Sequence, residues 1–108
     1  MFASKKCVPC TPGTKPIDVL NARRMLEHVP GWDLAMSDRA LKRRIVFKDF
    51  LSALAFVNQV GELAEAEGHH PDIMFGWGYA ECVLWTHDIA GLHENDFVMA
   101  AKINQLLA

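Results

Sequence analysis

The stretch DFLSALAFVNQVGELAEAEG, residues Asp49–Gly68, predicts the central helix of the fold. Asp49 is a good N-cap residue, because its carboxylate can accept hydrogen bonds from the free amides of a first helical turn. Gly68 stands where a helix favours a left-handed C′ residue. Apolar residues recur between these ends at helical spacing and predict a buried face made of Phe50, Ala53, Leu54, Val57, Gly61 and Ala64.

Two further helices are predicted toward the ends of the chain. The first runs from Ile17 to Val29 and stops at Pro30-Gly31. Its apolar face consists of Val19, Ala22, Leu26 and Val29. The segment ENDFVMAAKINQLLA, residues 94–108, closes the chain as another helix. Its buried residues are predicted to be Phe97, Ala100, Ala101 and Leu107.

Alternating apolar and polar residues predict two pairs of strands. The segments WDLAM (32–36) and ALKRRIVF (40–47) are separated by SDR, which turns the chain, so they form a hairpin. The alternation returns in YAECVLWT (79–86), and IMFGW (73–77) before it is a shorter neighbour. Within the hairpin, the basic run RALKRR is interpreted as the solvated side of the second strand.

The order of elements is therefore α-β-β-α-β-β-α. Because βαβ alternation is not sustained, the sequence predicts an α+β fold with an antiparallel sheet of about four strands and three helices packed on one face. Residues 1–108 form a single domain, and residues 1–15 are an irregular N-terminal arm. The other face of the sheet carries Tyr79 and Val83, or the residues that alternate with them, and no helix buries it. We therefore expect dimers or larger oligomers in which another copy of the chain covers this face.

Composition excludes several classes of partner. Hydrophobic residues make up 51% of the 108-residue chain and charged residues 22%, which is typical of a soluble globular protein. The net charge of −2 provides no basic field, so nucleic acid is not favoured. No apolar run approaches the ~20 residues that a membrane crossing needs. A secretory signal is also absent, which predicts a cytoplasmic protein with free thiols.

The three cysteines do not form a recognisable metal site. Cys7 and Cys10 make up a lone CxxC pair, and Cys82 lies in a predicted strand. A structural zinc site usually takes four ligands from two such pairs. We therefore expect no metal ion there.

Two adjacent histidines stand where the central helix stops. In EGHHPDI, residues 67–73, His69 and His70 follow the C′ glycine, and Pro71 fixes the exit of the chain. Consecutive side chains that leave a helix point in different directions, so two imidazoles can address two sides of one small ligand. His87, at the end of the last predicted strand, is expected to converge on them. The alternative is that the pair only interacts with the helix dipole.

These histidines belong to a longer pattern that resembles a known family. The pattern is Glu65, three residues, His69-His70-Pro71, five residues, Trp77, nine residues, His87, eight residues and Asp96. It is similar to the signature of the pterin-4a-carbinolamine dehydratases, which are also known as dimerisation cofactors of a homeodomain transcription factor. The similarity runs from about Pro16 to the end of the chain. The N-terminal CVPC also occurs in bacterial-type members.

The resemblance implies dehydration of a 4a-hydroxy-tetrahydropterin, formed by aromatic amino acid hydroxylases, to a quinonoid dihydropterin without a metal or organic cofactor. That reaction needs an acid at the 4a-hydroxyl and a base at N5. Histidine suits both roles, because its ordinary pKa of about 6.5 allows both protonation states near neutral pH. By analogy His70 is the acid, and His69 and His87 supply the base and ring contacts.

Further site residues follow from the same resemblance. The residues assigned to substrate binding are Glu65, Pro71, Thr86 and Asp88. Glu65 can also orient an imidazole. Asp96 is interpreted as structural, at the N3 position of a helix whose N-cap is His93. Most relatives have Ser or Thr at this cap, so with His93 the capping box is expected to be incomplete. The three tryptophans, Trp32, Trp77 and Trp85, are assigned to the core rather than to the site.

Two other functions remain open. One is a scaffold that binds or assembles other proteins, as some relatives of this fold do. The other is a metal-dependent hydrolase that uses the histidines as ligands. The expected partners are a pterin substrate, a homodimer or homotetramer and an aromatic amino acid hydroxylase or another protein. The sequence leaves open which pterin, which hydroxylase and which oligomer, and the role of Cys7 and Cys10.

Overall fold

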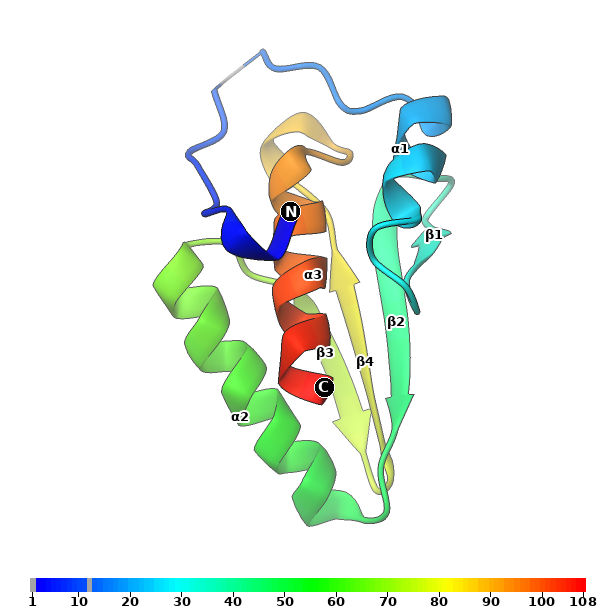
Figure 1. Ribbon diagram of the computed structural model, residues 1–108, viewed down its shortest axis with the longest axis vertical. Helices are drawn as coiled ribbons and strands as arrows, with labels where there is room; N and C mark the ends of the chain where they lie inside the picture. The colour runs from blue at the N-terminus through cyan, green and yellow to red at the C-terminus, as the bar shows by residue number, and fades with distance from the viewer. Residues whose placement is uncertain (1, 12) are drawn as a thin grey trace.

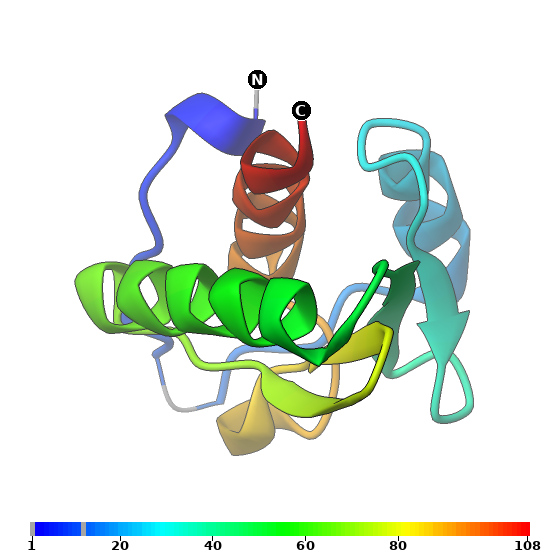
Figure 2. The same ribbon diagram turned by 90° about the horizontal axis from the view of Figure 1, so that it is seen from below.

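The computed structural model describes residues 2–11 and 13–108, and its element order confirms the predicted α+β fold. The elements are η1 (Phe2–Ser4), α1 (Val19–Leu26), β1 (Asp33–Ala35), β2 (Ala40–Val46), α2 (Phe50–Glu67), β3 (Asp72–Gly76), β4 (Tyr79–Leu84), η2 (His87–Ile89) and α3 (Glu94–Leu107). Figures 1 and 2 show the three α-helices on one side of the sheet. Among the described residues, no helix is both long and apolar enough to cross a membrane.

Local caps fix both ends of α2, as its sequence predicts. The Asp49 carboxylate accepts a hydrogen bond from the Ser52 amide at 2.8 Å, and this bond holds the pKa of the Asp49 carboxyl below its usual value. At the other end Gly68 has φ of 67°, in the left-handed region that favours glycine, and its amide donates to the Ala64 carbonyl. The helix therefore stops directly before the two histidines.

The sheet is antiparallel throughout, with the strand order β1-β2-β4-β3. In β4, Ala80, Cys82 and Leu84 are buried beneath the helices. Their neighbours Tyr79, Glu81 and Val83 lie on the opposite face and stay partly exposed. Burial raises the pKa of the Cys82 thiol to about 11, so it remains protonated and packs as an apolar residue.

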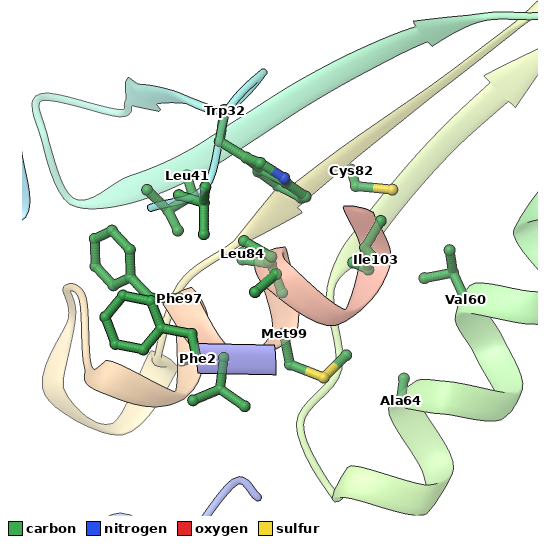
Figure 3. Packing of buried hydrophobic residues seen from close by; sticks show 14 of the residues in the cluster. Phe2, Trp32, Leu41, Val60, Ala64, Cys82, Leu84, Phe97, Met99 and Ile103 are labelled. Atoms are coloured by element: carbon green, nitrogen blue, oxygen red, sulfur yellow. The ribbon is translucent and has the colours of Figure 1, made fainter. Parts of the chain in front are cut away.

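Helix α3 lies at the centre of the core, between the sheet and the N-terminal residues (Figure 3). Its largest buried side chains, Phe97, Met99 and Ile103, are fully buried. Phe2 of η1 packs on Phe97 with ring centroids 5.8 Å apart. Trp32 is 4% exposed, which confirms its assignment to the core.

The buried face of α2 differs from the predicted one. Ala53 and Ala64 are buried as expected, but Phe56 and Val60 complete the face. Phe50, which was predicted to be buried, is 46% exposed and packs on Phe75. The reason is that α2 carries apolar residues around much of its circumference, so spacing alone allows neighbouring stripes.

The basic run on β2 is divided between the two faces of the sheet. Lys42 and Arg44 are exposed, as predicted. Arg43 points to the helix side, where its guanidinium donates to the Asn104 side-chain oxygen at 2.5 Å and to the Pro30 carbonyl at 3.4 Å. Trp32 donates to the same oxygen at 2.9 Å. The prediction that the whole run is solvated was therefore wrong for Arg43, because alternate strand residues face opposite sides.

Candidate active site

A hollow of about 670 Å³ opens at one end of the molecule. It is lined by residues 7–10, 67–72 and 85–88 and by Asn95. Figure 1 shows these segments gathered near the C-terminal end of α2: the N-terminal arm in blue, the start of β3, the η2 turn and the first turn of α3. Four separate segments of the chain thus form its wall, and all three predicted histidines line it.

The histidine pair enters this hollow because α2 stops at Gly68. The His69 amide still bonds to the Ala64 carbonyl at 3.3 Å, so the chain turns sharply at the helix end. Strand β3 begins at Asp72, immediately after Pro71. The two side chains diverge, as predicted: the His69 side chain is 13% exposed and that of His70 is 58% exposed.

His69 is held by a buried carboxylate. Its Nε2 lies 2.6 Å from Oδ1 of Asp96, whose side chain is fully buried. The other oxygen, Oδ2, accepts hydrogen bonds from the Thr86 hydroxyl and the His93 amide, both at 2.9 Å. A buried carboxylate is costly unless its oxygens are hydrogen-bonded, and here both are. An ionised carboxylate can only accept hydrogen bonds, so the Nε2–H of His69 is the donor in this pair, and Nδ1 is the other nitrogen of the ring.

The structure gives Asp96 a larger role than the sequence predicted. Asp96 does occupy the first turn of α3, as expected, but it also positions His69. The only sign of this role in the sequence was the position of Asp96 in the family signature. His69 and Asp96 are 27 residues apart, so no local sequence pattern reports their contact.

The cap of α3 also corrects the sequence prediction. Nδ1 of His93 accepts from the Asn95 amide at 3.0 Å, while Asp96 accepts from the His93 amide. The capping box is therefore formed, with an imidazole nitrogen in place of a hydroxyl oxygen.

His70 has a carboxylate partner on α2. Its Nε2 lies 2.5 Å from Oε2 of Glu65, and both side chains are exposed. Glu65 does not line the hollow and contacts His70 instead. Water screens such an exposed pair, so it contributes little to the stability of the fold. Its effect is to orient the His70 ring.

His87 lies beyond the end of its strand, since β4 stops at Leu84 and His87 opens the η2 turn. Its ring stacks on that of Trp85 with centroids 4.0 Å apart. The side chain is exposed, so His87 is not a buried histidine of the core. Trp85 lines the hollow, and Trp77 is 72% exposed in the turn between β3 and β4; neither belongs to the buried core.

The other predicted contacts are also at the hollow. Pro71, Thr86 and Asp88 line it, although the Thr86 hydroxyl is engaged with Asp96. Within residues 2–11 and 13–108, no three His, Cys, Asp or Glu side chains are grouped as a metal ion requires. Sequence reasoning did not predict that residues 7–10 of the arm would line the same space.

Comparisons with known proteins agree with this arrangement. Residues 15–106 match the family model described as pterin 4 alpha carbinolamine dehydratase. A protein of Halorhodospira halophila is 54% identical over 105 residues, covering 97% of this chain and 96% of its own. One of Methylococcus capsulatus is 51% identical over 107 residues, covering 99% and 94%. The names of both assign them provisionally to the pterin-4-alpha-carbinolamine dehydratases.

Two solved structures share the fold. One is a transcriptional coactivator/pterin dehydratase from Brucella melitensis, with a TM-score of 0.81 and 29% identity over 87% of this chain and 100% of that one. The other is described as a pterin dehydratase-like protein that is a RuBisCO assembly factor in the alpha-carboxysome. Its TM-score is 0.61 at 26% identity, over 73% of this chain and 92% of that one.

The contact between Asp96 and His69 can be tested by Asp96→Asn. The amide can donate to Nε2, so we expect the neutral His69 ring to move its proton from Nε2 to Nδ1. Imidazole ¹⁵N chemical shifts measure this exchange directly. Because a buried group changes its hydrogen bonding, the free energy of unfolding should fall by about 1–3 kcal/mol. An unchanged tautomer would contradict the role given to Asp96.

Proposed function

The chain belongs to the pterin 4 alpha carbinolamine dehydratase family, and we propose that it dehydrates a 4a-hydroxy-tetrahydropterin by histidine acid–base catalysis. In this reaction the bond between C4a and the hydroxyl oxygen breaks, and the oxygen takes a proton and leaves as water. N5 gives up its proton, and its electron pair forms the C4a=N5 bond of the quinonoid dihydropterin. The protein must therefore deliver one proton and accept another.

The observation that carries this proposal is the pairing of each adjacent histidine with its own carboxylate at the wall of one hollow. Asp96 holds His69 through Nε2, so Nδ1 is the nitrogen left to receive the N5 proton. Glu65 holds His70 in the same way, so its Nδ1 is the nitrogen left to serve the hydroxyl oxygen. Proton transfer by positioned groups typically contributes 10²–10⁴-fold to a rate.

The remaining residues serve binding in this proposal. His87, stacked on Trp85, presents an aromatic edge and a ring nitrogen to the hollow. Asp88 is exposed there and can accept hydrogen bonds from the amino and N3–H groups of a pterin. Pro71 limits the hollow beside His70. Thr86 acts on Asp96 rather than on the ligand.

A non-catalytic scaffold is the alternative. It is favoured by the structural likeness to a protein described as a RuBisCO assembly factor. A scaffold has no need for two imidazoles oriented by separate carboxylates. A metal-dependent hydrolase would instead lose activity on treatment with a chelator.

Turnover distinguishes the enzyme from the scaffold. A 4a-hydroxy-tetrahydropterin generated by an aromatic amino acid hydroxylase should dehydrate faster when this protein is present. His70→Ala should lower kcat by about 10²-fold, because it removes the proton donor. The folding midpoint should stay near normal, since the side chain is largely exposed. Absence of any acceleration by the natural protein would contradict the proposed function, and full turnover by the variant would remove His70 from it.

His87 gives a separate test through His87→Gln. Glutamine keeps a hydrogen-bonding group but cannot carry a proton, so kcat/KM should fall by about tenfold or more. The exposed His28, which does not line the hollow, provides the matched control, and His28→Gln should leave kcat/KM unchanged. Equal values for the two variants would show that His87 is dispensable.

We also propose that the protein forms homodimers or homotetramers. The uncovered sheet face carries Val46, which is 80% exposed, and Met74, which is 56% exposed, beside the partly exposed Tyr79. Sedimentation at micromolar concentration should show a species heavier than the 12.1 kDa monomer. A single 12.1 kDa species would contradict this expectation.

A further inference from the structure

The N-terminal arm is fastened across the hollow by hydrogen bonds to its backbone. The Val8 amide donates to Oδ1 of Asn95 at 2.9 Å, and Nδ2 of Asn95 donates to the Val8 carbonyl at 2.6 Å. Asn95 is 4% exposed, so its buried amide is committed to the arm. The two peptide groups that flank the Cα of Val8 are thereby both held by Asn95.

A second fastening lies one residue earlier. The Cys7 amide donates to Oε1 of Glu67 at 2.9 Å, and the Cys7 thiol faces the Asn95 carbonyl at 3.7 Å. Burial, and then the nearby Glu67 carboxylate, raise the pKa of the Cys7 thiol to about 12. Cys7 therefore stays a neutral thiol that packs inward against the core.

The residues that fasten the arm are neighbours of those that carry the histidine site. Asn95 immediately precedes Asp96, which holds His69. Glu67 lies two residues before His69, at the last position of α2. One turn of α3 and one end of α2 thus position both the imidazole and the arm. In Figures 1 and 2 the blue arm runs past this end of α2 in both views.

The side chain of Val8 is exposed at this wall. It is 56% exposed and lines the hollow, and the hydrogen bonds to Asn95 hold the backbone on both sides of its Cα. An apolar side chain held rigidly at the rim of a site that contains imidazoles and carboxylates offers contact area to a ligand with an apolar face. A pterin has such faces on its flat ring and carries its polar groups at the edges.

We propose that residues 7–10 are a substrate-binding wall, in which Val8 and Pro9 contact the apolar surface of the bound pterin and Asn95 is the positioning residue. The inference rests on the proposed dehydratase function and deepens it. The wall contributes binding and not proton transfer, so its loss raises KM and leaves kcat largely unchanged.

The first test is Val8→Asp, which places a charge where an apolar face should rest. KM for the 4a-hydroxy-tetrahydropterin should rise by about tenfold or more, with kcat within about threefold of the natural value. Leu20→Asp is the matched control, because Leu20 of α1 is also an exposed apolar residue, does not line the hollow and lies outside the sheet face proposed for association. It should leave both constants unchanged. An unaltered KM in Val8→Asp would contradict the proposal that residues 7–10 contact the substrate.

The second test is Asn95→Ala, which frees the arm while keeping the Asn95 backbone amide that bonds to His93. KM should rise as in Val8→Asp, and hydrogen exchange at the Val8 amide should become faster. A loss of kcat with KM unchanged would overturn the assignment of Asn95. If the natural protein turns over no pterin, the proposed function fails and the wall fails with it. If the protein turns over the pterin but neither variant changes KM, the dehydratase function stands and only the role of residues 7–10 is contradicted.

Discussion

The structure of the site depends on one buried carboxylate, that of Asp96. Its two oxygens accept hydrogen bonds from the His69 ring, the Thr86 hydroxyl and the His93 amide, which come from three different segments. The same contacts satisfy the first turn of α3 and orient the His69 ring. Because a buried carboxylate is unfavourable without such donors, the segments that supply them must come together when the chain folds. Helix capping and the orientation of an imidazole are thus parts of one interaction.

The fold could be predicted in most of its elements because its signals are local. Asp49 and Gly68 mark the ends of α2, and alternation marks the strands, with strand boundaries that differ from the predicted ones by at most two residues; α1 ends at Leu26, three residues before the predicted Val29. The errors arose where two faces look alike in sequence. Helix α2 is apolar on more than one side, so Phe50 was assigned to the core in place of Phe56. On β2, charge suggested solvent for Arg43, but a partner on α3 lies 61 residues away.

The site could be predicted in part. The histidine pair was recognisable, since the helix stop and the proline are encoded beside it. The partner of His69 and the wall formed by the arm were not, because they join residues separated by 27 and by 87 positions. No periodicity in the sequence reports contacts of that kind. They follow only from the packing of α3 against the end of α2.

The two carboxylate–imidazole pairs differ in how much water surrounds them. The pair formed by Glu65 and His70 lies in solvent, with side chains 79% and 58% exposed, whereas Asp96 is fully buried beside His69. Dissolved ions weaken attraction between exposed groups and reach buried ones far less, with a Debye length of about 8 Å at 0.15 M salt. The ionic strength of the medium therefore acts unequally on the two imidazoles. When both imidazoles carry a proton, a rise in salt weakens the attraction between His70 and Glu65 more than that between His69 and Asp96, so the surrounding electrolyte acts on one half of the site and largely spares the other.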